Sequence, residues 1–302
     1  MAVTKWAVYA VKVASVVWGV TGTVAMEDAP NVVKEANDGS GGVRIVALLT
    51  REQKITFSTR QIDTVLDTCG TIGVDLSTIS GGVTLYCVKL GQVARVAGSV
   101  HRSFAATKGM MYVSGISASQ SGLAAASVVV DPLSTDGDAV AVTESATATL
   151  PSVSTPTRVF TLGDVGLNGT LQEGLQSMSL TLNQGVDKAP YDGGVYATCS
   201  HIDEGSPVVE LETAEAGGLA SLLSTGGVTV SSNVDVFLRG CQNLNMPYAK
   251  NEEEHVRLRI AAGLIVRGGV SGERLAMAKF TVHAAKTGST QMVQYAKDVA
   301  IA

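Results

Sequence analysis

The order of short apolar segments occurs twice along this chain, and such a repeat constrains the fold more than any single motif does. Lys54–Thr59 precedes a helical pattern in the first half, and Val208–Thr213 precedes another in the second. Gly82–Val88 and Asn233–Arg239 follow these patterns. Matching landmarks are separated by 154 residues (211 − 57) and by 151 residues (237 − 86). We therefore predict two tandem copies of one fold.

A further landmark places the boundary between the copies. Ser127–Val130 resembles Gly263–Val266 at an offset of only 136 residues (264 − 128), which predicts that the second copy lacks about fifteen residues of the preceding loop. Glu144–Thr157 contains two prolines and many small polar residues, so we expect an exposed linker there. The predicted domains are residues 1–150 and 151–302.

Short β-branched runs separated by Gly, Asn and Asp predict a mainly β, antiparallel protein. Trp6–Val13 is one such run, and Lys12 distinguishes it from a secretory signal, so we expect an extended segment. Two stretches instead have apolar residues at helical spacing. They are Ile62, Val65, Leu66 and Cys69 in the first half, and Leu219, Leu222 and Leu223 in the second.

The sequence offers little that points to chemistry. Only 16% of residues are charged and the net charge is −5, which disfavours a surface that grips nucleic acid. No phosphate-binding glycine loop or nucleophile elbow is complete. The four histidines lie far apart in the sequence, and we interpret each as a surface or interface side chain; the four cysteines are interpreted as small, buried free thiols. We expect no enzyme activity, no cofactor and no metal. No run reaches the ~20 apolar residues that span a bilayer, so we expect a soluble protein made in a cytoplasm.

Taken together, these patterns resemble the phage tail tube (major tail) proteins. The resemblance is carried by Leu180–Gly185, the loop to Tyr191–Tyr196, and His201–Thr213, where a hairpin leads through Pro207 to a strand and then to the predicted second helix. The first half shares it through the repeat but has Lys54 in place of Pro207.

The resemblance implies a β-sandwich or barrel-like tube fold with a short flanking helix, here duplicated in tandem. It also implies a structural virion protein that self-assembles into stacked rings, contacts other tail proteins, and lets genomic DNA pass through the lumen without specific binding. Assembly would take place in the host cytoplasm, without a membrane partner. Two copies per chain imply a ring of three chains with pseudo-sixfold symmetry, and a single tube fold per chain implies six chains. Another β-sandwich virion protein (capsid decoration, tail terminator or baseplate component) and a bacterial binding or adhesion module remain alternatives.

The family's long hairpin loop, which reaches the neighbouring ring, corresponds to the polar segments Glu27–Gly42 and Gln184–Gly194. The resemblance therefore implies these inter-ring contact residues: Asp28, Asn31, Lys34, Asp38, Asp187, Lys188, Tyr191 and Asp192. We also expect residues 1–20 and 285–302 to be arms that lie on adjacent subunits, so that deleting Met1–Ala10 would weaken assembly more than folding.

Overall fold

The structure is a computed structural model. It describes residues 6–35, 45–90, 101–153, 156, 158–172, 174–190, 193–214, 227–242, 246–271 and 277–301. The predicted second helix, with Leu219, Leu222 and Leu223, lies outside the described residues.

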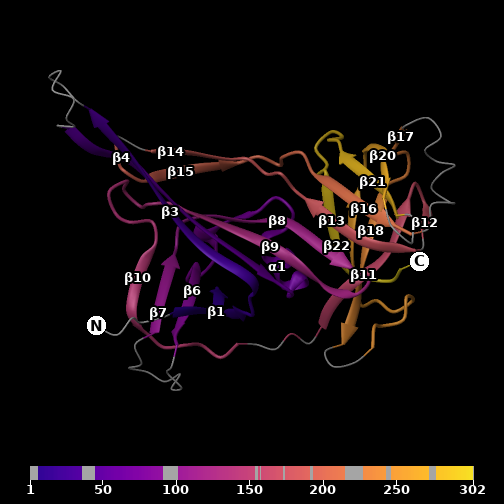
Figure 1. Cartoon of the computed structure of the whole chain (residues 1–302), viewed down its shortest axis with the longest axis horizontal. Coiled ribbons are helices and arrows are strands. Elements are labelled where there is room, and N and C mark those ends of the chain that lie inside the picture. Colours follow the sequence, from indigo (N-terminus) through magenta and orange to yellow (C-terminus); the bar gives the residue numbers. More distant parts are fainter. Residues whose placement is uncertain are drawn as a thin grey trace.

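The protein is mainly β, with antiparallel sheets and one short α-helix, which confirms the predicted fold class (Figure 1). One five-stranded sheet, here called the first-half sheet, has the order β10–β7–β6–β1–β2. Its strands are β1 (Trp6–Val13), β2 (Val16–Trp18), β6 (Val83–Lys89), β7 (His101–Ala106) and β10 (Thr143–Ala148).

A second five-stranded sheet, the second-half sheet, has the order β12–β11–β18–β19–β22. Its strands are β11 (Arg158–Leu167), β12 (Thr170–Gln172), β18 (Val234–Gln242), β19 (His255–Ile260) and β22 (Val293–Val299).

The largest sheet takes strands from both halves and is called the shared sheet. Its order is β17–β20–β21–β16–β13–β8–β9–β4–β3, and β5 also pairs with β8. Its first-half strands are β3 (Thr21–Glu35), β4 (Ile45–Thr59), β5 (Val74–Asp75), β8 (Gly109–Ser119) and β9 (Gly122–Pro132). Its second-half strands are β13 (Leu175–Thr181), β16 (Val208–Thr213), β17 (Gly227–Thr229), β20 (Gly263–Ser271) and β21 (Met277–Ala284). The hairpin of β14 (Val186–Pro190) and β15 (Ala197–Ile202) is separate from this sheet.

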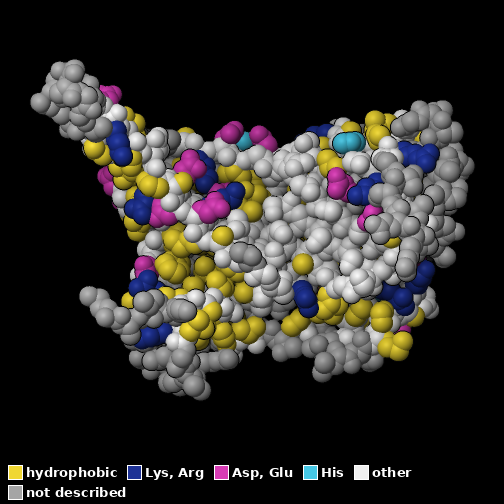
Figure 2. Space-filling model, viewed as in Figure 1, with side chains coloured by type: hydrophobic (Ala, Val, Ile, Leu, Met, Phe, Trp, Pro, Cys, Tyr) yellow, Lys and Arg dark blue, Asp and Glu magenta, His cyan; other side chains and the backbone are white. Residues whose placement is uncertain are grey.

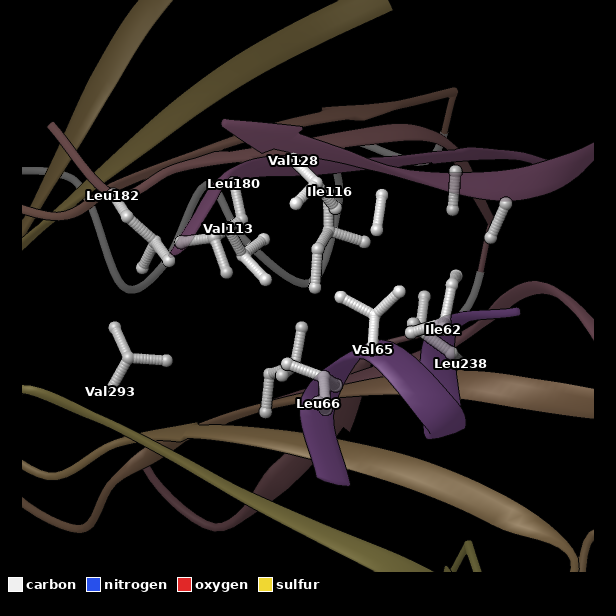
Figure 3. Packing of buried hydrophobic residues seen from close by; sticks show 14 of the residues in the cluster. Ile62, Val65, Leu66, Val113, Ile116, Val128, Leu180, Leu182, Leu238 and Val293 are labelled. Carbon is white, nitrogen blue, oxygen red and sulfur yellow. The ribbon is translucent and has the colours of Figure 1, made fainter. Parts of the chain in front are cut away.

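The single described α-helix, α1 (Ile62–Cys69), has the bounds that the apolar spacing predicts. All four apolar residues of that pattern are buried. Figure 3 shows that Ile62, Val65 and Leu66 point from α1 into the apolar space where Ile116 and Leu238 also lie. A 3₁₀ turn, η1 (Leu76–Thr78), follows, and one continuous core includes buried residues of all three large sheets.

Three sequence-based expectations about chain ends and connections are wrong. The predicted linker is partly strand, because Thr143–Ala148 forms β10 and pairs with β7. The predicted terminal arms are not arms, because β1 lies between β6 and β2 and β22 pairs with β19. Termini that look β-prone in sequence have found partners within the chain, since burial of an apolar strand stabilises it more than solvation does.

Candidate assembly surfaces

The strand order of the first half recurs in the second half. The first-half sheet reads β10–β7–β6–β1–β2, and the second-half sheet reads β22–β19–β18–β11–β12. Within the shared sheet, β3–β4–β9–β8 with β5 on β8 matches β13–β16–β21–β20 with β17 on β20. Therefore β20 corresponds to β8 at an offset of 154 residues (263 − 109). The predicted match of Ser127–Val130 with Gly263–Val266 is wrong, because similar β-branched runs cannot be distinguished without their pairing partners.

Unusual backbone conformations repeat with the strands. Ala14 and Asn168, 154 residues apart (168 − 14), both have positive φ in the turn that ends the first strand of each small sheet. Gly109 and Gly263, also 154 apart, both have large positive φ. A Cβ atom added to Gly109 would lie 2.2 Å from the Asp131 carbonyl oxygen, so both a special φ and a close approach require glycine there.

A pair of buried histidines repeats in the same way. His101 and His255 are 154 residues apart (255 − 101), and both are fully buried. Nδ1 of His101 accepts a hydrogen bond from the Lys89 amide at 3.3 Å, and Nδ1 of His255 accepts one from the Gly240 amide at 3.0 Å. Lys89 and Gly240 are themselves 151 residues apart (240 − 89). The prediction that every histidine is a surface or interface side chain is therefore wrong for these two within this chain, whereas His201 is exposed.

His255 gives the fold a pH-dependent stability. Nδ1 accepts the Gly240 amide while Nε2 lies 2.9 Å from the Ala249 carbonyl oxygen, so the ring is held neutral. Burial, together with nearby Arg239, lowers the pKa of His255 below 6.5 although backbone carbonyls and Glu252 oppose the shift. Between the folded-state pKa and about 6.5, the unfolded chain binds more protons than the folded chain does. The stabilisation that neutral His255 contributes is therefore complete above pH 6.5 and decreases as the pH falls through this window.

We expect urea midpoints to fall between pH 7 and pH 5.5, and the pKa of His255 measured by NMR titration to lie below 6.5. His255→Gln should remove most of this slope, whereas the matched variant His201→Gln should retain it. A His255 pKa at or above 6.5 would contradict the assignment.

The two halves meet head to tail at β8 and β13. The register places Ser179 opposite Ser117 and Leu180 opposite Ile116. Gly115 lies opposite Thr181, and a Cβ atom there would approach the Leu180 carbonyl oxygen to 2.7 Å. In the order of the shared sheet, β8 is the last strand of the first half and β13 is the first strand of the second half. These two strands pair with each other.

Helix α1 closes the same junction from the side. Nζ of Lys297 lies 2.6 Å from Asp67, and the guanidinium of Arg158 lies 3.5 Å from Asp63. The hydroxyl of Thr71 donates to the Val293 carbonyl at 2.6 Å. Although burial raises the pKa of Asp67, its hydrogen bonds with Lys297 and Tyr295 leave that pKa below its usual value. The first half thus packs on the second-half sheet through both apolar and ionic contacts.

The first predicted contact segment is a long hairpin rather than a loop. β3 and β4 pair from Thr21 to Glu35, and the described residues of their outer part, called the first arm (residues 28–35 and 45–51), extend away from the body (Figure 1). Asp28 forms a bidentate ion pair with Arg51 at 2.6 and 2.5 Å, which lowers the pKa of Asp28. Sequence reasoning did not anticipate the exposed apolar side chains of this arm: Val32, Val46, Leu48 and Leu49.

The second predicted segment forms the β14–β15 hairpin, whose described residues, 184–190 and 193–202, are called the second arm and lie against the first half. The Arg51 amide donates to the Val195 carbonyl at 2.8 Å. Nζ of Lys188 lies 2.6 Å from Asp131, and both side chains are largely buried. The hydroxyl of Tyr112 donates to the same carboxylate at 3.0 Å. Burial of the hydroxyl, and to a lesser extent the negative charge of Asp131, raises the pKa of Tyr112.

The structure separates the predicted inter-ring residues into groups. Asp28, Asn31 and Lys34 lie exposed on β3, and Asp187 lies exposed on β14. Lys188 is held inside the chain by Asp131, and a pocket beside it is lined by Glu27 and Glu52, which adjoin the first arm, and by Asp187 of the second arm. Asp38, Tyr191 and Asp192 lie outside the described residues. Sequence reasoning missed Arg51, Asp131 and Tyr112, because they contact the second arm only after it packs against the first half.

The solvent face of the shared sheet is polar but carries few charges. A shallow hollow on it is lined by serines of β8 and β13, by the β16 carboxylates Glu210 and Glu212, and by Lys279. In the space-filling view, charged side chains are scattered and much of the visible surface is neither charged nor apolar (Figure 2). Within the described ranges, His, Cys, Asp and Glu side chains nowhere gather in threes that could hold a metal ion. All four cysteines are free; Cys69 and Cys241 are buried as predicted, whereas Cys199 is exposed.

No helix in the described part of the chain combines the length and apolar character needed to cross a membrane. No protein-family model matches the chain, and no curated protein sequence matches it.

Proposed function

We propose that this chain is a structural virion protein that self-assembles into stacked rings and so forms a phage tail tube. The observation that carries the proposal is the head-to-tail joining of two halves with one strand order, β8 of the first to β13 of the second. A head-to-tail contact leaves a complementary edge at each end, and its repetition either closes a ring or extends a filament. The halves would be two tandem tube folds, residues 1–150 and 151–302.

A ring of three chains would then contain six tube folds with pseudo-sixfold symmetry. The shared sheets would form one continuous barrel, which removes exposed sheet edges. Their solvent faces would line the lumen, where the carboxylates Glu210 and Glu212 flank Lys279 and disfavour a grip on DNA phosphates. DNA would pass without specific binding, and the arms would contact the neighbouring ring and other tail proteins.

Negative-stain electron microscopy of concentrated protein tests the proposal. We expect tubes or stacked rings, and cross-sections with three two-lobed subunits around the lumen. Six identical chains around the lumen would eliminate the tandem duplication. Dispersed particles at every concentration would overturn the tube and favour another β-sandwich virion protein or a binding module.

A further inference from the structure

The chain ends in two strand edges that match the two strands of its own internal junction. β3 corresponds to β13, and within the described residues β3 pairs with β4 alone. β20 corresponds to β8, and β17 pairs with β20 only at Leu264–Val266. In the same way, β5 occupies only Met110 and Met111 of β8 and leaves the remaining length to β13.

We infer that β20 of one chain pairs with β3 of a second copy in the register of the β8–β13 junction. This inference rests on the proposed self-assembly and specifies its contact. Subtracting 154 from the β13 residues and adding 154 to the β8 residues converts the observed pairs into predicted ones. Ser179 opposite Ser117 becomes Ala25 opposite Ser271, and Leu180 opposite Ile116 becomes Met26 opposite Val270.

Burial at the β3 edge supports a missing neighbour. Met178 and Leu180 on β13 are 2% and 1% exposed, because β8 and the core cover them. Their counterparts on β3, Val24 and Met26, pack against the core but are only partly buried. An apolar pair of this kind at a sheet edge is completed when another strand adds to that edge.

The β20 edge carries the glycine that the internal junction requires. Gly115 on β8 cannot accept a side chain, because a Cβ atom would approach the Leu180 carbonyl oxygen of β13. The corresponding residue on β20 is Gly269 (115 + 154), and both strands have a register irregularity at this point. If another strand pairs closely with β20, a side chain at position 269 would collide with that strand, which explains why glycine recurs here.

One end of the first-half sheet is apolar and, among the described residues, only partly covered, whereas the corresponding end of the second-half sheet is buried. The residues on this face, called the apolar end, are Trp6, Val8, Cys87 and Phe104. They are partly buried or, for Val8, 37% exposed. Their counterparts in the second-half sheet are Phe160, Leu162, Leu238 and Leu258, all 4% exposed or less.

The occupant that fits this apolar end is therefore the second half of the next chain. It would pack on the first-half sheet in the way that the first half packs on the second-half sheet within one chain. Leu238 lies near α1 in Figure 3, and it is Cys87 that takes its position in the first-half sheet. Arg102 is the exception to the apolar pattern, and its guanidinium lies 5.0 Å from the Trp6 ring centre, where its cation–π contact shields part of that ring. One contact between chains thus joins the sheet edges and covers the apolar end.

Disulfide trapping tests the register. In a Cys199→Ser background, Ala25→Cys with Ser271→Cys places two thiols on predicted antiparallel partners, about 4.5–5.5 Å apart between Cα atoms and so within disulfide range. We expect mild oxidation to give covalently linked dimers and trimers on non-reducing gels. Glu27→Cys with Ser271→Cys is the matched control, because it represents a slip of two residues on the same face, and it should give roughly tenfold less product.

The internal junction supplies a positive control. Ser117→Cys with Ser179→Cys should form a disulfide within one chain and no linked species. Val8→Asp should leave the monomer folded, because this side chain is exposed, yet reduce linking through Ala25→Cys and Ser271→Cys at least tenfold.

The outcomes separate this inference from the proposed function. More product from the slipped pair, or tubes without any linked chains, would overturn the register while the tube remains. Linked chains in the predicted register without tubes would support the contact and overturn the tail tube. Neither tubes nor linked chains would overturn both.

Discussion

Removing Met1–Val13 is expected to unfold the first half rather than merely weaken assembly. The deletion takes away β1, which hydrogen-bonds to β6 on one side and β2 on the other. Ala10 and Val11 are fully buried, and Val13 is 2% exposed. Each buried valine contributes about 1.5–3 kcal/mol, against a total stability of about 5–15 kcal/mol for a typical domain. Circular dichroism and thermal melting should show loss of the cooperative transition.

Two point variants on the same strand separate folding from assembly. Val11→Asp places a carboxylate in the core and should cost more than ~4 kcal/mol, enough to remove most native protein. Val8→Asp places the same charge on the exposed apolar end and should melt within about 0.5 kcal/mol of the unsubstituted chain. Equal melting of both variants would show that β1 is a dispensable arm.

Shortening the first arm is expected to abolish tube formation while the subunit stays folded. Asn31 and Thr50 are register partners, so replacing Val32–Leu49 by Asn-Gly joins them through a favoured two-residue turn. The described part of the removed segment contributes no buried residue to the core, and the Asp28–Arg51 ion pair is retained. The variant loses the exposed apolar side chains that give this arm a surface for a neighbouring subunit.

Microscopy and melting curves check this result together. We expect an unchanged melting temperature and dispersed particles or single rings in place of long tubes. The matched control is Lys34→Ser with the arm at full length, which should still form tubes. Long tubes from the shortened chain would show that the arm does not join rings.

Local pattern was sufficient for several elements of this fold. The spacing of Ile62, Val65, Leu66 and Cys69 predicted α1 with its observed bounds, and the run Trp6–Val13 predicted β1. Phe57 corresponds to Leu211 as predicted, because the neighbouring pairs Met26–Ile55 and Leu180–Val209 are also 154 residues apart. These successes share one reason: the side-chain period of a segment reports which face is buried, and that period is local.

The sequence by itself thus determined a mainly β chain, the position of α1 and a repeated order of elements. Only the tertiary structure decided which strand lies beside which. Several strands have similar apolar residues, and backbone hydrogen bonds can form between any two of them, so the sequence of a strand does not identify its neighbour. That is why β20 was matched to the wrong strand, why predicted loops became paired arms, and why Lys188 turned inward to Asp131. The repeat of His101 at His255 was present in the sequence, but only their burial against matching backbone amides gave it meaning.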